Sequence, residues 1–394
     1  MSNKLDNSLE KIDKVFEKMR MQSISVDGGR VSDRTIDTYK DMVKSLMREV
    51  NKEFGISNVR KVKESHINDL VHKRIDKYHD GDTSQAYNLK TMTAALKAFN
   101  LGVEKTNVFN HKKKFALGNP EDIRETMKEQ NVFRHSKAST VLRATPDECW
   151  SVIENIKKKG YNTETRKAAY HASRISLETG GRISAILRLR PCDIDLNAKT
   201  ITYVKDKGGL TRTLKISDDT AKYLEELTAG KKLTERIFNP KRSDGTFLSV
   251  KELRKEINKV VSDAGQHLTR KEDVRIKNKK GKHTIVEVEK KASPHMFRKG
   301  FSLQRTMENY EKLSSKTAID KYIAEKVAEN PKVKDKLETV RDRINKDRNT
   351  KRDLTRMEYA IFLTSLDLGH FRNDVITAFY TTFNEVKDYF DKKK

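Results

Sequence analysis

The sequence predicts a mainly α-helical protein with small β-hairpins, made of an all-helical N-terminal domain and a C-terminal α+β domain. Apolar residues recur at helical spacing through residues 30 to about 135, whereas short β-rich runs flank glycine turns further along the chain. The length of 394 residues is enough for two domains of ordinary size.

The composition favours a nucleic-acid partner. Lys and Arg number 83 against 57 Asp and Glu, which gives a formal net charge of +26. Such an excess attracts polyanions, either nucleic acid or an anionic membrane surface. No run approaches the roughly 20 apolar residues of a membrane-spanning helix, and the N-terminal stretch lacks a signal-peptide core. We therefore expect an intracellular nucleic-acid-binding protein without a membrane partner.

The N-terminal region is predicted to be helical from its start. Apolar residues between Leu5 and Met19 fall at helical spacing, so residues 1–29 are predicted to form a helical arm or an oligomer contact. The stretch SVDGGRVS interrupts the pattern, and Ser32 can cap the next helix. Because further helical patterns follow, residues 30–134 are predicted to form a small helical DNA-binding domain.

A basic linker is predicted between the two domains, at residues 135–144. It ends at Thr145-Pro146, a helix-start signal with proline in the first turn. A basic linker suits a protein that encircles a duplex, although an ordinary surface loop explains it equally well. The candidate DNA-binding residues in and beside it are Arg134, Lys137 and Arg143.

The C-terminal domain, residues 145–394, is predicted to mix helices with two hairpins. One helix ends at Gly180-Gly181, and the next is expected to continue until Pro191. The run TITYVKDKGGLTRTLKI is typical of a hairpin around a Gly-Gly turn. A second, strongly basic hairpin is predicted at about 273–291. The candidate DNA contacts of the two hairpins are Lys205, Arg212, Lys279, Lys280 and Lys282.

Four separate features contain reactive or phosphate-binding residue types. They are an arginine that opens a helix, where backbone N–H groups favour an anion, a lysine in a hairpin turn, a His-x-x-Arg pair on one helical turn, and a Gly-His pair followed by a tyrosine. Each feature alone has an ordinary explanation, such as a solvated lysine or a packed core tyrosine. The residues concerned are Arg182, Lys207, His295, Arg298, His370 and Tyr380.

In this order and in these contexts, the residues resemble the tyrosine recombinase family, also called the phage integrase family. The stretches that carry the resemblance are TGGRISAILRLRPCDID, KDKGGLTRTLKI, PHMFRKGF and LDLGHFRNDVITAFY. The resemblance covers the chain from about residue 145 onward. The preceding helical region resembles the family's core-binding domain only in size and placement. A core-binding domain and a catalytic domain that form a clamp around DNA are therefore implied.

The resemblance also implies a role for each residue. Tyr380 would be the nucleophile that forms a 3′-phosphotyrosyl intermediate. Arg182 and Arg298 would bind the non-bridging phosphate oxygens, and Lys207 would protonate the 5′ leaving oxygen.

Two histidines complete the implied site. His295 could take the tyrosine proton or return it, and His370 would hydrogen-bond the phosphate or the attacking oxygen. Neither a metal nor ATP would be required, and no cofactor is expected. This agrees with Cys149 and Cys192, which lack metal-ligand spacing, and with the missing Gly-rich phosphate loop.

Three features depart from the family pattern. Ala185 stands where the family commonly has an acidic residue, so an acidic side chain that supports the catalytic residues would be missing. Tyr380 comes one residue later than the commonest spacing, and Tyr389 is the reserve nucleophile. Arg298 and His370 are 72 residues apart. An inserted helical hairpin is therefore predicted at about 308–353, where it would clamp DNA, contact another protomer or only decorate the surface.

The sequence thus predicts a site-specific DNA recombinase or integrase that acts on double-stranded DNA during integration or excision of a mobile element or phage. The resemblance further implies a tetramer on paired sites, in which the tail helix at 381–394 docks on a neighbour or on its own domain. An accessory DNA-bending or directionality protein and a location at a bacterial or phage nucleoid in the cytoplasm are also expected. The alternatives are a type IB-like topoisomerase and a DNA-binding relative with reduced catalysis.

Overall fold

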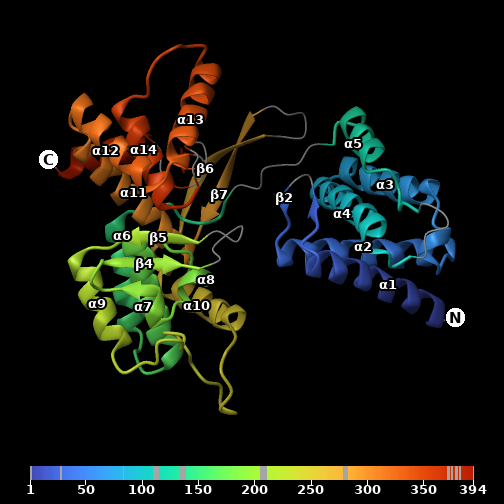
Figure 1. Ribbon diagram of the computed structural model, residues 1–394, viewed down its shortest axis with the longest axis horizontal. Helices are drawn as coiled ribbons and strands as arrows, with labels where there is room; N and C mark the ends of the chain where they lie inside the picture. Colours follow the sequence, from blue (N-terminus) through green and yellow to red (C-terminus); the bar gives the residue numbers. More distant parts are fainter. Residues whose placement is uncertain are drawn as a thin grey trace. The chain divides into compact units, whose positions relative to one another are not determined.

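The computed structural model is mainly helical, with small β-sheets (Figure 1). The chain divides into two compact units, which are described separately. Unit 1 comprises residues 1–138 with 273–286, and unit 2 comprises residues 139–272 with 287–394. The structure describes residues 2–26, 29–82, 84–109, 115–132, 139–204, 211–277, 283–370, 373, 376–377, 380 and 383–393.

Unit 1 is a helical domain in which α1, α2 and α4 pack against one another. Ser32 caps α2 by accepting a hydrogen bond from the backbone N–H of Thr35, and Gly55 ends this helix in the left-handed conformation, with a φ of 68°. A short β1–β2 pair, Ser25–Val26 with Gly29–Arg30, precedes α2. The helices are α1 (Ser2–Met21), α2 (Asp33–Phe54), α3 (Glu64–His79), α4 (Gln85–Thr106) and α5 (Pro120–Glu129).

Helix α1, in the segment predicted to form an N-terminal arm, packs into unit 1. Ile12, Val15 and Phe16 on α1 are buried in the core of unit 1. Gly102 on α4 permits this close packing, because a Cβ there would lie 2.6 Å from the Val15 side chain. The spacing of apolar residues predicted the helix, but it contained no information about which surface covers the apolar face.

Unit 2 is built around α7 and α11, which pack against each other and against α6. Thr145 and Glu148 form a capping box at the start of α6, as the Thr-Pro-Asp-Glu sequence predicts. The helices are α6 (Pro146–Lys158), α7 (Glu164–Thr179), α8 (Ile183–Ile186), α9 (Asp218–Thr228), α10 (Val250–Ala264), α11 (His295–Lys312), α12 (Lys316–Glu329), α13 (Lys332–Arg348), α14 (Arg356–Asp367) and α16 (Phe383–Lys393).

Two small sheets belong to the region after α8. Strands β3 (Ile194–Asp195), β4 (Thr200–Tyr203) and β5 (Arg212–Lys215) form an antiparallel sheet in that order, with Tyr203 opposite Arg212. Strands β6 (Arg270–Lys277) and β7 (His283–Lys290) pair in a second sheet. The paired strands of both predicted hairpins are therefore present. Their tips, residues 205–210 and 278–282, lie outside the described residues.

The helix expected from Arg182 to Pro191 is much shorter than predicted. It ends at Ile186, and Leu189 accepts a hydrogen bond from the backbone N–H of Ile237. Arg190 has extended backbone angles, φ −125° and ψ 158°. A residue that precedes proline avoids the helical region, so Pro191 ends the helical conformation earlier than the apolar spacing suggested.

The stretch between α11 and α14 folds into two helices, α12 and α13, which pack against each other. Val333, Leu337 and Val340 on α13 share a small apolar core with Phe362 on α14. This part of the chain is consequently attached to the helix that leads into the Gly-His pair.

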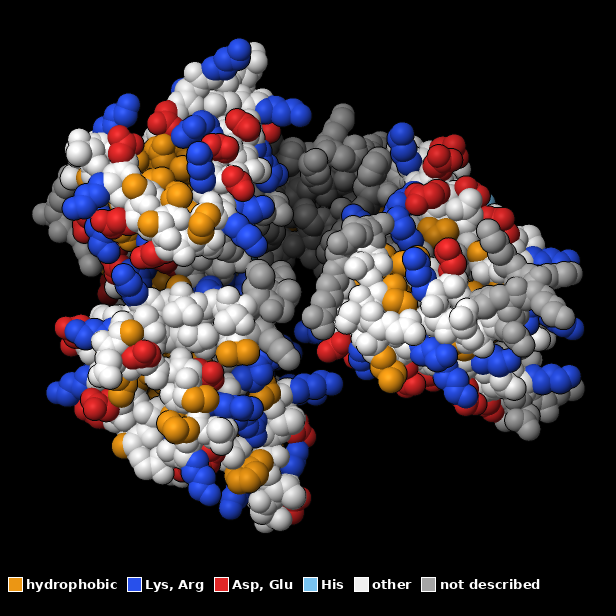
Figure 2. All heavy atoms as spheres, in the orientation of Figure 1, with side chains coloured by type: hydrophobic (Ala, Val, Ile, Leu, Met, Phe, Trp, Pro, Cys, Tyr) orange, Lys and Arg blue, Asp and Glu red, His pale blue; other side chains and the backbone are white. Residues whose placement is uncertain are grey.

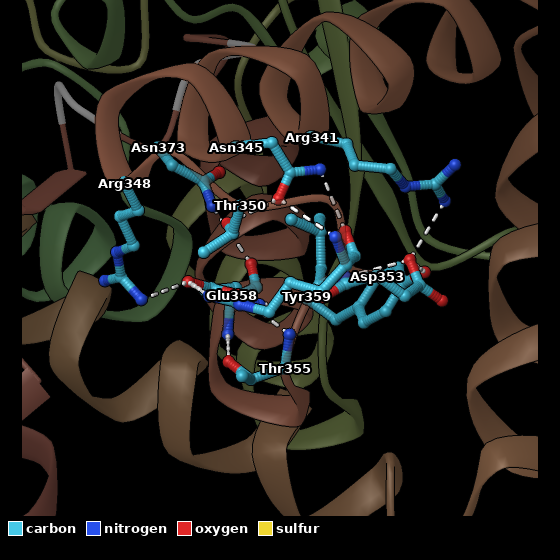
Figure 3. Close-up of polar contacts among 11 residues, drawn as sticks. Arg341, Asn345, Arg348, Thr350, Asp353, Thr355, Glu358, Tyr359 and Asn373 are labelled. Atoms are coloured by element: carbon cyan, nitrogen blue, oxygen red, sulfur yellow. Dashed lines mark hydrogen bonds and ion pairs between the residues drawn. The ribbon is translucent and has the colours of Figure 1, made fainter.

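A polar cluster fixes the end of α13 to the start of α14 (Figure 3). The buried carboxylate of Glu358 accepts hydrogen bonds from both terminal nitrogens of Arg352, at 2.7 and 2.8 Å, and Arg348 lies 3.3 Å away. The backbone oxygen of Glu358 accepts a hydrogen bond of 3.0 Å from the side chain of Asn373. The cluster therefore reaches the segment that carries Tyr380.

The two ends of unit 2 are held to α11 and its neighbours. The segment before α6 forms a parallel β-bridge between Val141 and Lys291, and Val141 also accepts a hydrogen bond from the ammonium group of Lys299. The tail helix α16 packs on α11 of its own chain, with Val386 buried against Leu303 and Met307. Among the described residues, no helix is long and apolar enough to cross a membrane.

Candidate phosphate-binding active site

Arg182 is positioned by the tight turn that ends α7. Gly180 caps this helix with a φ of 62°, and a Cβ at Gly180 would lie 2.5 Å from the ring of Phe301. Glycine is needed there both for the left-handed backbone and for the close contact. The chain then turns so that Arg182 becomes the N-cap residue of α8.

Arg298 is the central cation of the site and is almost fully buried, with 1% of its surface exposed. Its guanidinium donates hydrogen bonds to the backbone oxygens of Gly180 and Leu368. Burial, together with the nearby charges of Arg182 and Arg212, lowers the pKa of Arg298 to about 10, while Tyr380 opposes the shift. The three arginines therefore lie in one electrostatic environment, and Arg298 remains charged at neutral pH.

The hydroxyl of Tyr380 lies beside this guanidinium. It accepts a hydrogen bond of 3.2 Å from Nε of Arg298, and Nε2 of His370 lies 3.1 Å away. The tyrosine ring packs against Phe301, Ile361 and other apolar residues, so the side chain is both buried and hydrogen-bonded. A positive charge and an imidazole at the hydroxyl are the groups that can favour and accept loss of its proton.

His370 is presented by a turn directly after α14. Gly369 adopts a φ of 67°, and the backbone N–H of His370 donates to the oxygen of Ser365 at 2.8 Å. Nε2 of His370 lies 3.1 Å from a terminal nitrogen of Arg298 as well as near Tyr380. Arg298 thus bonds to the α7–α8 turn through Gly180 and to the turn that presents His370 through Leu368.

His295 is the first residue of α11 and lies beside the tyrosine. It is exposed, and its ring centre is 5.4 Å from that of Tyr380 in an edge-on arrangement. The spacing of His295 and Arg298 by one helical turn places both at the same site.

A cavity of about 650 Å³ adjoins these residues. Arg182, His295 and Arg298 line one side of it. The opposite side belongs to α10, whose basic residues were not singled out in the sequence. Their spacing along residues 250–264 could have indicated them, since side chains three and four positions apart share a helix face. The α10 residues that line the cavity are Arg254, Lys255, Asn258 and Lys259.

Arg212, a candidate DNA contact, is largely buried. It is 9% exposed, its guanidinium donates to the backbone oxygen of Asp367, and it lies 5.0 Å from the centre of the Tyr203 ring. It therefore connects β5 to the turn that presents His370. Arg143 is partly exposed and forms an ion pair of 3.6 Å with Glu385 on α16.

The remaining predicted site residues cannot be placed. Lys207, the predicted proton donor, lies outside the described residues. So do the DNA-contact candidates Lys205, Arg134, Lys137, Lys279, Lys280 and Lys282.

Ala185 is packed into the hydrophobic core of unit 2 with 3% exposure. The structure thus has an apolar contact at the position where the family pattern has a carboxylate.

The geometry defines a class of protein. Guanidinium groups, imidazoles and a tyrosine hydroxyl converge beside a cationic cavity, on a helical unit with a small sheet. Side chains of these types are able to bind a phosphate group and to attack it through a side-chain oxygen.

The chain was compared with known proteins. Residues 142–309 match the model of the phage integrase family. No curated protein matches the chain in sequence.

Solved structures resemble the fold. The XerH site-specific recombinase bound to a palindromic difH substrate aligns at 14% identity with a TM-score of 0.52, covering 98% of this chain and 97% of that chain. The Tn1549 transposon integrase in complex with transposon right-end DNA aligns at 13% identity with a TM-score of 0.45, covering 97% of this chain and 99% of that one.

Proposed function

We propose that the protein is a DNA strand-exchange enzyme that cuts and rejoins DNA through a 3′-phosphotyrosyl intermediate. The observation that supports this most strongly is the position of the Tyr380 hydroxyl, within hydrogen-bonding distance of both Arg298 and His370. A tyrosine that served only as core would not need a buried cation and an imidazole at its hydroxyl.

In the proposed cleavage step, the oxygen of Tyr380 attacks the scissile phosphorus. Its proton passes to His370, whose Nε2 is 3.1 Å from the hydroxyl. The bond from phosphorus to the 5′ oxygen breaks, and that oxygen takes a proton from Lys207. The 3′ phosphate stays attached to the tyrosine.

The negative charge that develops on the non-bridging oxygens is stabilised by the arginines that line the cavity. Arg298 is fixed by backbone oxygens on both sides, so it needs no reorganisation when the phosphate arrives. Arg182 and His295 approach the same cavity from the α7–α8 turn and from the start of α11. In this proposal the charge of the two arginines, Arg182 and Arg298, replaces a metal ion.

Rejoining reverses these steps with a new 5′ hydroxyl. The phosphotyrosyl ester retains the energy of the broken linkage, so the incoming hydroxyl restores DNA without ATP. We propose that the enzyme acts in this way for integration or excision of a mobile element or phage, as a homotetramer on paired sites at the nucleoid. An accessory DNA-bending or directionality protein is a further proposed partner.

The tail helix is the proposed route to the tetramer. Because α16 covers Leu303 and Met307 of its own chain, the same apolar surface would receive a neighbour's tail if the helices exchanged. Val386→Asp should then reduce assembly on paired sites as well as stability, as measured by light scattering with DNA present. A variant that assembles normally would exclude the tail from the interface.

The catalytic proposal is tested by trapping the protein on nicked DNA from the region that flanks its gene. A nick close to the cut site lets the short fragment that carries the new 5′ hydroxyl diffuse away, so the covalent complex accumulates. Wild-type protein should give a species that survives denaturation, and Tyr380→Phe should give none. Adduct formation by Tyr380→Phe would disprove the assignment, and DNA binding without any adduct from the wild type would instead indicate a relative with reduced catalysis.

A further inference from the structure

A second cavity, larger than the one at the active site, lies between the sheet and the helices α12 and α13. Its volume is about 1000 Å³, and β5, α11, α12, α13 and the turn at Asp367 to Gly369 form its walls. Eight of its lining residues are basic and two are acidic. We call it the hairpin groove, since the α12–α13 pair forms its outer wall.

Both acidic residues of the hairpin groove are already paired. Glu329 lies 2.7 Å from the ammonium of Lys326 and 3.7 Å from that of Lys215, and Asp367 lies 3.4 Å from the guanidinium of Arg305. The acidic side chains therefore neutralise only part of the positive charge around the groove.

Three exposed lysines account for much of the excess positive charge around the groove. Within the part of the chain that the structure describes, the ammonium groups of Lys312, Lys332 and Lys336 have no ion pair. Lys332 and Lys336 are four residues apart on α13 and so share one face. Burial of Val333 and Leu337 against the core fixes the rotation of this helix. The two lysines are consequently held toward the groove.

The hairpin groove adjoins the active site because Arg182 lines both cavities. A chain of phosphates that has one member at Arg182 and Arg298 would therefore have its neighbours within reach of the groove. Ring and aliphatic surfaces of Phe301, Tyr322 and Leu366 contribute to the lining. A cationic rim over aromatic and apolar walls is the kind of surface that binds a single nucleic-acid strand.

We propose that the hairpin groove binds the phosphodiester backbone of one DNA strand next to the scissile phosphate. This inference rests on the proposed function and assigns the α12–α13 pair a role in holding DNA. The volume is at the upper end of the roughly 300–1000 Å³ range of small-ligand pockets. It suits a short stretch of one strand, whereas a whole duplex would contact only the rim.

The test compares two charge-reversal variants of equal charge change in the full-length protein. Lys332→Glu/Lys336→Glu alters the groove, and Lys321→Glu/Lys334→Glu alters exposed lysines on the same two helices that do not line it. Affinity for a mixed-sequence single-stranded oligonucleotide, and for the duplex of the same length, is measured by fluorescence anisotropy at several salt concentrations. Each lost phosphate contact reduces the slope of log affinity against log salt by about 0.7 for single strands and 0.9 for duplex.

The groove variant should bind at least one of the two DNAs, the single strand or the duplex, roughly 10-fold more weakly than the wild type. With that DNA the salt slope should fall by about 1.4 to 1.8, the value for two lost phosphate contacts. The control variant should change the slope by less than half of this. A loss of affinity for the single-stranded oligonucleotide alone would mean that the strand is unpaired when it is bound in the groove. Equal behaviour of the two variants in both arms would overturn the proposal.

A separate measurement keeps this result distinct from the proposed catalytic function. Adduct formation by the wild-type protein tests the catalytic proposal, whereas the affinity of the groove variant relative to the control variant tests the groove. If the wild-type protein forms no adduct but the groove variant loses more DNA affinity than the control variant, the proposed role of the groove is supported and the catalytic proposal fails.

Discussion

Arg298 is the single side chain on which the site depends most. One guanidinium bonds two backbone oxygens, from Gly180 and Leu368, together with the hydroxyl of Tyr380. A lysine has the charge but not the planar set of donors, so it cannot make all these contacts at once.

Arg298→Lys should therefore slow cleavage by about 100- to 1000-fold, the usual effect of removing one preorganised donor from an oxyanion site. Single-turnover adduct formation gives the rate, and a thermal melt shows whether the protein remains folded. Arg343→Lys, on the exposed side of α13, is the matched control and should leave the rate unchanged. An Arg298→Lys enzyme of normal rate would mean that the guanidinium geometry is unimportant.

Arg212 gives a second prediction at the residue scale, because its contacts connect β5 to the turn that presents His370. Arg212→Lys loses the bond to Asp367 and the contact with Tyr203. We expect cleavage to slow by about 10-fold or more, in keeping with loss of a charged hydrogen bond worth roughly 1.5–3 kcal/mol. DNA affinity should stay the same, as measured by anisotropy. The opposite pattern, with weaker binding and normal cleavage, would restore the DNA-contact role.

These two arginines show what the sequence could and could not predict about the site. Local motifs pointed to Arg182, His295, Arg298 and His370, because each lies in a short pattern with a chemical meaning. The contact between Arg212 and Asp367 joins residues 155 positions apart, and no local pattern encodes it. The spacing of the basic residues on α10 could have indicated a shared helix face, but only the fold shows that this face borders the cavity.

At the scale of elements, the α13–α14 junction is held by the buried carboxylate of Glu358 (Figure 3). Burial opposes ionisation of this group, but hydrogen bonds from Arg352 and Thr355 outweigh it and lower the pKa of Glu358 below the ordinary 4.5. A carboxyl group with a lowered pKa stabilises the fold above its unfolded-state pKa, and this stabilisation is lost as the pH falls through the folded-state value.

Glu358→Gln should consequently lower the free energy of unfolding at neutral pH by about 2 kcal/mol, the range for a lost charged hydrogen bond with partly exposed partners. The difference from the wild type should shrink below about pH 4.5. Urea titrations at several pH values measure it, and Glu338→Gln on the exposed face of α13 is the control. A difference that does not vary with pH would show that the charge of Glu358 is not what stabilises the junction.

For the individual elements, apolar periodicity and capping residues predicted where the helices lie better than they predicted what the helices pack against. The capping sequence at Thr145 and the glycines after Thr179 set helix ends that the structure reproduces. The α8 helix was overestimated because the extended residue before Pro191 overrides apolar spacing. The packing of α1 into unit 1 was not predictable, since an apolar face does not specify its partner.

At the scale of the whole molecule, the charge is the dominant property. Figure 2 shows Lys and Arg side chains over both units on the face drawn, interleaved with Asp and Glu. With a formal net charge of +26, binding to DNA of any sequence should weaken steeply with salt. Log affinity should fall linearly with log salt, by roughly 0.9 for each phosphate contact on duplex. Binding that changes little with salt would contradict an electrostatic interface.

The most direct test of the account identifies the atom that joins DNA to the protein. Covalent complexes trapped on a nicked duplex are digested with trypsin and nuclease, and the modified peptide is sequenced by mass spectrometry. The account predicts a nucleotide attached through its 3′ phosphate to Tyr380. A nucleotide on Tyr389, or one attached through its 5′ phosphate, would contradict it.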